Sequence, residues 1–157
     1  MIKVGDRVPK GVLKTLTEDG VIDLRTEEIF SRKKVVMFGV PGAFTPGCSR
    51  NHMPGYVEAY ETIIEKGFDT VACMAVNDAW VMHAWGESRG AIGKLLMLAD
   101  GSGFFAKSLG IDSDLSAYGM GLRCKRFSMV VNNGIVEQFN VDERAIEFTS
   151  AKATCKL

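Results

Sequence analysis

The apolar residues of this chain fall into short runs separated by turn residues. Two of the runs, at 35–40 and 70–76, are apolar on both faces, which is typical of strands buried inside a sheet. Between them, residues 49–66 show apolar positions at helical spacing. A strand, a helix and a second strand in this order predict two parallel strands joined by a crossover.

Further runs predict the remainder of a mixed sheet. Asp19-Gly20 and Asn133-Gly134 each separate two apolar stretches, which indicates two β-hairpins. The other expected elements are a helix at 79–89, a strand at 94–99, a short helix at 104–109, a less regular segment at 111–124 and a short terminal helix that ends the tail at 148–157. This order predicts an α/β fold, with helices on both faces of a mixed sheet, in one domain over residues 1–157.

Composition and charge exclude several classes of function. The chain has 19 basic and 19 acidic residues and a formal net charge of zero, so no basic surface for nucleic acid or a membrane is indicated. No apolar run approaches the length of about 18 residues that spans a membrane, and the N-terminus lacks signal-peptide character. Four cysteines in a chain of this length without a signal peptide favour a reducing compartment, the cytoplasm, over a disulfide framework, and no second close pair of ligands indicates a zinc site.

The stretch from Pro41 to Cys48 is the one on which a chemical function can be built. It follows the first buried strand, turns through Pro41 and Gly42, and brings a helix start close to Cys48. The unpaired N–H groups and partial positive charge of a helix start acidify a thiol, and the thiolate is the reactive form. Spacing alone leaves two interpretations open, a reactive thiolate or a turn that contains a buried, inert cysteine.

The literal residues of this stretch resemble a known family. Pro41, Thr45 and Cys48 fit the pattern Pro-x-x-x-Thr-x-x-Cys, and the string PGAFTPGCSRNHMPGY is similar to the active-site segment of type II, or peroxiredoxin-5-like, peroxiredoxins. The resemblance runs over nearly the whole chain. It implies a thioredoxin-like fold with an added N-terminal β-hairpin, and a thiol-dependent peroxidase that uses no metal, haem, flavin or other cofactor. It also implies a homodimer paired through the face that bears the active-site loop.

The resemblance implies a role for each site residue. Cys48 would attack a hydrogen peroxide or alkyl hydroperoxide and become a sulfenic acid. Thr45 would bond the thiolate, and Pro41 would shield the sulfur from water; as alternatives, Thr45 caps the turn and Pro41 only shapes it. The positive charge would come from Arg126, in the segment Lys-Arg-Phe-Ser, unless Arg126 is a surface charge. Arg123 is the rival, and on one regular strand positions 123 and 126 would face opposite ways.

Recycling of the sulfenic acid leaves several routes open. Cys73 matches the second cysteine of plant type II members, although its apolar strand also suits a buried thiol, and bridging would require local unfolding. Cys155 and Cys124 are weaker candidates. The remaining route is a one-cysteine cycle in which glutaredoxin, glutathione or thioredoxin is the direct reductant. The terminal Cys155-Lys156-Leu157 resembles a Ser-Lys-Leu peroxisomal address, which is an alternative to the cytoplasm.

Two other functions fit parts of the pattern. His52 lies four residues after Cys48, so the pair could serve a Cys–His hydrolase, but this offset favours a packing or hydrogen-bonding role for the imidazole. A thioredoxin-like binding module with a redox-sensing cysteine is the second alternative. Six apolar residues could line a pocket mouth or a dimer interface, or belong to the core: Phe44, Trp80, Trp85, Leu115, Tyr118 and Met120.

Overall fold

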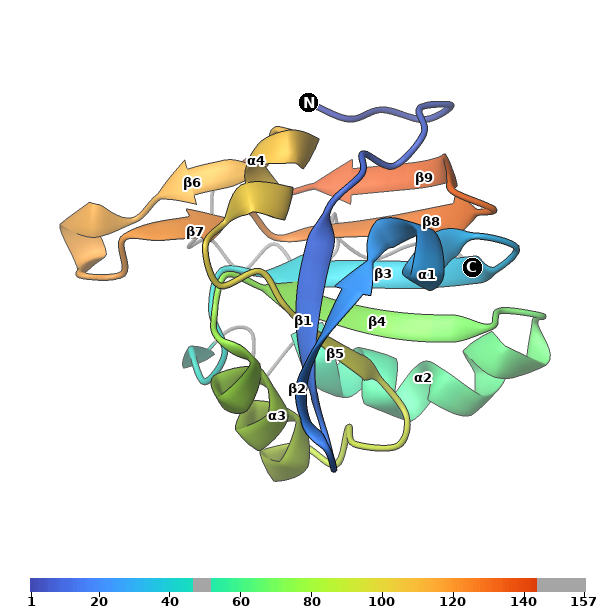
Figure 1. The fold of residues 1–157 in the computed structure, drawn as a ribbon, viewed down its shortest axis with the longest axis horizontal. Coiled ribbons are helices and arrows are strands. Elements are labelled where there is room, and N and C mark those ends of the chain that lie inside the picture. Colours follow the sequence, from blue (N-terminus) through green and yellow to red (C-terminus); the bar gives the residue numbers. More distant parts are fainter. Residues whose placement is uncertain (47–51, 144–157) are drawn as a thin grey trace.

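The computed structural model describes residues 1–46 and 52–143 (Figure 1). Along the chain the elements are β1 Val12–Thr17, β2 Gly20–Arg25, α1 Thr26–Phe30, β3 Lys34–Val40, α2 Met53–Glu65, β4 Thr70–Ala75, α3 Ala79–Ser88, β5 Leu96–Ala99, α4 Phe104–Leu109, β6 Asp112–Asp114, the short 3-10 helix η2 Ser116–Tyr118, β7 Leu122–Cys124, β8 Phe127–Asn132 and β9 Ile135–Val141. None of these helices is both long and apolar enough to cross a membrane. The terminal helix expected at 148–157 lies outside the described residues.

Seven strands form one mixed sheet in the order β2-β1-β5-β4-β3-β8-β9. The predicted crossover is confirmed, because β3 and β4 pair in parallel, with Val40 opposite Ala75 at their carboxyl ends. Both predicted hairpins are confirmed as well, as the antiparallel pairs β1–β2 and β8–β9. The central strands are therefore the apolar runs of the sequence, and the hairpins supply the two edges.

Helices cover both faces of the sheet, as the order of elements predicts. Alternate residues of β3 enter two hydrophobic clusters: Val35 and Met37 pack with α1 and α4, whereas Val36, Phe38 and Val40 pack with α2 and α3. Figure 1 shows α2 and α3 next to each other along one side of the sheet. Because both faces are buried, β3 reads in the sequence as a continuous apolar run rather than an alternating one.

Two regions differ from the sequence-based expectation. The segment expected to be less regular contains β6 and β7, which pair antiparallel as a small arm that projects from the main sheet (Figure 1). Each of these strands has three residues, too few for periodicity to reveal. The strand expected from residue 94 begins at Leu96, because the backbone N–H groups of Lys94 and Leu95 both donate to the carbonyl of Ala91.

Strands β3 and β8 approach closely where the main sheet meets the turn after β3. Gly39 lies opposite Phe127 in the antiparallel register, and Phe127 is fully buried. A Cβ atom at position 39 would overlap the ring of Phe127, so only glycine fits while the ring stays in place. This contact fixes β8 against β3 at the end of β3 from which the turn departs.

We expect Gly39→Ala to lower the free energy of unfolding by about 1–3 kcal/mol, because the buried ring must shift to admit a methyl group. The matched control is Gly55→Ala in α2, where the added methyl group meets nothing within 4 Å apart from its chain neighbours and the backbone of its own helix. Alanine favours helix, so the control should be neutral or stabilising by up to about 1 kcal/mol. Urea denaturation followed by circular dichroism measures both variants. Equal stability of the two would show that the Gly39–Phe127 contact imposes no constraint.

Candidate active site

The turn that follows β3 is held in a strained conformation. We call residues 41–46 the reactive turn. Its hydroxyl-bearing residue, Thr45, donates from Oγ1 to the carbonyl of Gly42 at 2.7 Å, and from its backbone N–H to the same oxygen at 3.4 Å. Phe44 has a φ of 63°, which is costly for a residue with a side chain. Pro41, the first residue of the turn, is buried. Thr45 therefore closes the turn, and Cys48 lies outside the described residues.

Asn77 holds the reactive turn from the neighbouring strand. Its Oδ1 accepts a hydrogen bond from the backbone N–H of Ala43 at 3.0 Å. Asn77 follows β4, and the carboxyl ends of the parallel strands β3 and β4 meet at one edge of the sheet. The next residue, Asp78, caps α3 by accepting from the N–H of Val81. The contact from Asn77 could have been anticipated from a polar residue at the end of the strand next to β3.

Strand β7 holds the other side of the turn. The Sγ of Cys124 donates to the carbonyl of Val40 at 3.2 Å, and Nη1 of Arg123 donates to the carbonyl of Pro41 at 3.5 Å. These two acceptors are consecutive residues of the chain. The sequence did not suggest either contact, because β7 itself was not predicted as a strand.

Arg126 is a buried cation at the same edge of the sheet. It directly precedes β8, whose Phe127 lies opposite Gly39, and only 4% of it is exposed. Its Nη1 lies 3.0 Å from Nδ1 of His52. A guanidinium only donates hydrogen bonds, so Nδ1 of His52 is the acceptor and the ring carries its proton on Nε2. The burial is opposite to that expected of a surface charge at the start of a strand.

The His52 ring is fixed by aromatic neighbours as well as by Arg126. Its centroid lies 5.0 Å from that of Phe38 and 5.5 Å from that of Tyr56, and the rings of Phe38 and Tyr56 stack 4.0 Å apart. His52 therefore has both the packing and the hydrogen-bonding role that its offset from Cys48 favours. Because Nδ1 accepts from a guanidinium, this nitrogen does not serve as the general base of a hydrolase.

Arg123 and Arg126 do not share a strand. The expectation that they face opposite ways on one regular strand therefore does not apply. Arg123 belongs to β7, which ends at Cys124, and Arg126 precedes β8. Alternation along a strand therefore does not separate them. The Arg123 guanidinium contacts the reactive turn itself, at the Pro41 carbonyl, whereas that of Arg126 contacts His52.

The two cysteines that the structure describes lie on opposite faces of the main sheet. Cys73, on β4, is fully buried in the cluster that includes Phe38 and Tyr56, beneath α2. Cys124 is equally buried in the cluster on the other face. Neither forms a disulfide. Cys73 can form a disulfide with a residue near the reactive turn only if the packing between α2 and β4 opens. Cys155 lies outside the described residues.

The six apolar residues considered for a pocket mouth or an interface divide into surface and core. Phe44, Trp80 and Tyr118 are exposed by 54%, 64% and 65%. The remaining three are Trp85 and Leu115, which are buried, and Met120, which is half-buried. Phe44 and Trp80 lie on neighbouring segments, because the N–H of Ala43 is bonded to Asn77 just before α3. One exposed aromatic side chain, Phe44, thus belongs to the reactive turn, and another, Trp80, lies on the neighbouring helix α3.

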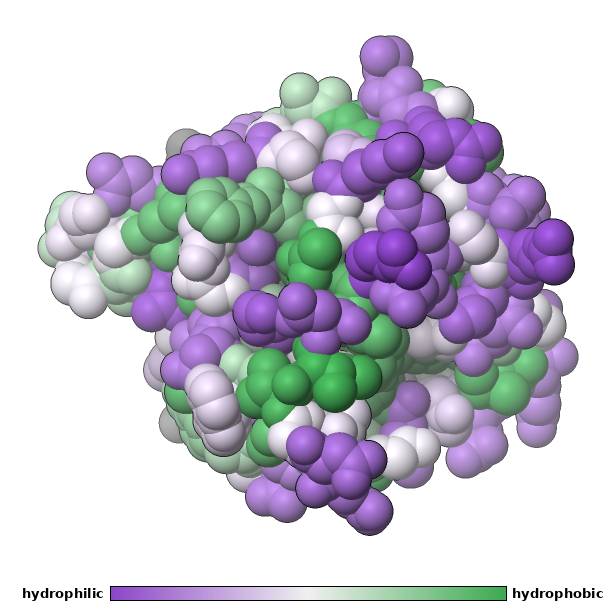
Figure 2. Space-filling view, in the orientation of Figure 1, coloured by the Kyte–Doolittle hydropathy of each residue, from purple (hydrophilic) through white to green (hydrophobic). Residues whose placement is uncertain are grey.

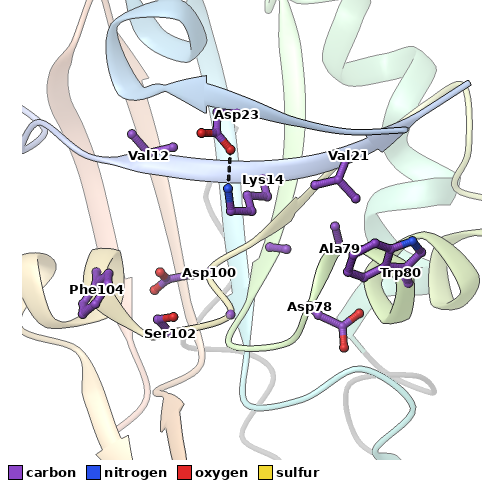
Figure 3. A pocket seen from close by; sticks show the side chains of 12 residues that line it. Val12, Lys14, Val21, Asp23, Asp78, Ala79, Trp80, Asp100, Ser102 and Phe104 are labelled. Carbon is purple, nitrogen blue, oxygen red and sulfur yellow. Dashed lines mark hydrogen bonds and ion pairs between the residues drawn. The ribbon is translucent and has the colours of Figure 1, made fainter. Parts of the chain in front are cut away.

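A cavity of about 630 Å³ lies between the hairpin β1–β2 and the starts of α3 and α4. Figure 3 shows Lys14 paired with Asp23 over this cavity, with Trp80 and Phe104 on opposite sides. In Figure 2, hydrophobic residues reach the surface over this hairpin between hydrophilic ones. Burial raises the pKa of Asp100 against the opposing effect of backbone N–H groups at the start of α4. Asp100 lines the cavity, and its two carboxylate oxygens accept from two of those N–H groups.

Comparison with known proteins places the chain in a family. The model of the family described as Redoxin matches residues 3–154. Peroxiredoxin-2D of Arabidopsis thaliana is 41% identical over 153 residues, which cover 97% of this chain and 94% of the relative.

Two solved structures extend the comparison. Reduced Prx3 of Vibrio vulnificus in complex with hydrogen peroxide has a TM-score of 0.90 and 43% identity, over 98% of this chain and 96% of that one. Peroxiredoxin 5 of Alvinella pompejana has a TM-score of 0.83 and 34% identity, over 91% of each chain. The fold is therefore thioredoxin-like, as the resemblance of the sequence implied. The chain belongs to the peroxiredoxins of the type II, peroxiredoxin-5-like branch, which are thiol-dependent peroxidases.

Proposed function

We propose that this peroxiredoxin reduces hydrogen peroxide and alkyl hydroperoxides with Cys48 as the attacking thiolate, next to Arg126, Thr45 and Pro41. The observation that carries the proposal is the buried guanidinium of Arg126, held at the edge of the sheet where the reactive turn departs. A cation away from water stabilises a thiolate, and then the charge that develops on the peroxide oxygens, more strongly than an exposed one does.

The proposed reaction balances without a cofactor. The Cys48 thiolate attacks one peroxide oxygen, an S–O bond forms and the O–O bond breaks, and the other oxygen leaves as hydroxide or alkoxide and takes up a proton. Sulfur is oxidised by two electrons to the sulfenic acid while the peroxide is reduced. The Thr45 hydroxyl now donates to the carbonyl of Gly42, so bonding the thiolate or the peroxide would require it to exchange that acceptor.

Recycling by an external thiol fits the described cysteines better than an internal disulfide. Cys73 has no exposed surface and packs beneath α2. We therefore propose that glutathione, glutaredoxin or thioredoxin condenses with the sulfenic acid, releasing water and leaving a mixed disulfide that a second thiol reduces. A thiol-dependent cycle of this kind suits a reducing compartment such as the cytoplasm, where a pool of reduced thiols is maintained.

A homodimer through the face bearing the reactive turn is the second part of the proposal. Phe44 and Trp80 are more than half exposed on neighbouring segments of this face. Large aromatic side chains contribute strongly to protein interfaces when a partner covers them. Pairing through this face would remove both from water and enclose the turn.

The first test is peroxide consumption by the Cys48 and Arg126 variants. We expect Cys48→Ser to consume no peroxide above the level without enzyme, because a hydroxyl is not a nucleophile at neutral pH. Arg126→Gln should lower the second-order rate constant about a hundredfold, through loss of the buried cation. Stopped-flow measurement with hydrogen peroxide and a fluorescent thiol probe checks both. Full activity of Cys48→Ser would refute the proposed function.

The recycling route is tested by mass spectrometry of the peroxide-treated protein with glutathione present. We expect a mixed disulfide between Cys48 and glutathione, because Cys73 is enclosed by the packing of α2 on β4. Cys73→Ser should retain turnover with glutathione and glutaredoxin. A Cys48–Cys73 bridge as the main product, with turnover lost in Cys73→Ser, would contradict a one-cysteine cycle.

The dimer is tested by analytical ultracentrifugation of Trp80→Asp. A carboxylate at the centre of an apolar interface should raise the dimer dissociation constant about tenfold or more. The matched control is Val4→Asp, which adds the same charge at a residue that is 60% exposed in the N-terminal segment. A wild-type protein that is monomeric, or two variants that dissociate equally, would argue against this interface.

A further inference from the structure

The arm formed by β6 and β7 touches the reactive turn through several adjacent residues. Cys124 donates from Sγ to the carbonyl of Val40, and Arg123 donates from Nη1 to the carbonyl of Pro41. Nε of Arg123 also donates to the carbonyl of Met120 at 2.9 Å. The planar guanidinium is thereby anchored within its own arm, and the other branch of its fork is directed at the turn. Among the described residues, both hydrogen bonds of Arg123 go to backbone carbonyls.

The packing around Gly42 shows how closely the arm lies against the turn. A Cβ atom at Gly42 would lie 3.1 Å from Nη1 of Arg123, 3.1 Å from Cγ2 of Thr45 and 3.4 Å from Cε of Met120. Three side chains therefore converge on one point above the Gly42 backbone, two from the arm and one from the turn itself. Gly42 is buried, and its missing side chain is what allows this approach.

The turn needs such external contacts because its conformation is costly. A positive φ at Phe44 persists only where the surroundings determine it. Asn77 binds the turn from the β4 side at Ala43, and the arm binds it from the other side at Val40 and Pro41. Carbonyls and an N–H on both sides of Gly42 are thus held by side chains from β7 and from the segment between β4 and α3.

We propose that Arg123 is a positioning residue for peroxide reduction, and that together with Cys124 it clamps the consecutive carbonyls of Pro41 and Val40. The clamp fixes the backbone that carries Thr45 and leads to Cys48. This inference rests on the proposed function and assigns Arg123 a task distinct from that of Arg126. Small displacements of reacting groups lower rates strongly, so a clamp that acts only through the backbone leading to Cys48 still affects the rate.

The test separates the clamp from the positive charge. Arg123→Met removes the donors and the charge, whereas Arg123→Lys keeps the charge but cannot bind two carbonyls with a planar fork. The second-order rate constant for hydrogen peroxide is measured against pH, which gives both the plateau rate and the pKa of the reactive thiol. We expect both variants to lower the plateau about tenfold, as for the loss of one charged hydrogen bond, while the midpoint of the pH profile stays near that of the wild type.

The control is Arg89→Met at the exposed end of α3, which should match the wild type. A wild-type plateau in Arg123→Lys would show that charge alone acts and would overturn the clamp. So would a plateau unchanged in both Arg123 variants. If the wild type itself consumes no peroxide, the proposed function fails instead, so the two failures are distinct.

A second pair of variants tests the clamp if substitution of Arg123 impairs folding. Cys124→Ser keeps a donor for the carbonyl of Val40 and should retain the wild-type plateau, whereas Cys124→Ala should lower it about threefold, consistent with the loss of one weaker hydrogen bond. Hydrogen exchange gives a direct readout. The amides of Ala43 and Thr45 should exchange faster in Arg123→Met and Cys124→Ala than in the wild type, while those of β4 remain unchanged. Equal exchange at Ala43 and Thr45 in every variant would overturn the proposal.

Discussion

The structure around the site depends on the burial of one guanidinium group. A buried cation is tolerated only where acceptors replace the water it has lost, and Arg126 is 4% exposed. Nδ1 of His52 is one such acceptor, and it can accept only while the ring keeps its proton on Nε2. The stacked rings of Phe38 and Tyr56 hold that imidazole in place. One polar contact thus links β8, the start of α2 and the core of β3.

The reactive turn lies where three strands meet. β3 supplies the chain, β4 continues into Asn77, and β7 approaches from the projecting arm. The carboxyl ends of parallel strands gather such loops at one edge of a sheet, which is where ligands are bound in open α/β folds. The close contact of Gly39 with Phe127 sets β8 against β3 at the same end. The packing of the sheet and the position of Arg126 are therefore consequences of the same register.

Much of this arrangement can be predicted from local sequence patterns. The remainder cannot, because it depends on contacts between distant parts of the chain. The apolar runs predicted β3 and β4, turn residues predicted both hairpins, and the motif placed Pro41 and Thr45 in one turn. The pairing of His52 with Arg126 joins residues 74 positions apart, and that of Cys124 with Val40 spans 84. Contacts at such separations depend on the register of β3 with β8 and on the path of the arm. Strands of three residues, such as β6 and β7, leave no periodic signal that would reveal that path.

Zero net charge is compatible with a strongly positive local environment, because burial rather than charge count sets the potential at a site. The nineteen basic residues are balanced by nineteen acidic ones, and exposed pairs such as Lys3 with Asp6 are screened by water. Arg126 is removed from that screening, so its field acts over a short distance at higher strength. Arg123 is only half-buried and donates its hydrogen bonds to backbone carbonyls. Two arginines three positions apart in the sequence therefore have different roles. Burial makes Arg126 a source of positive electrostatic potential, and hydrogen bonding to the backbone makes Arg123 a part of the scaffold.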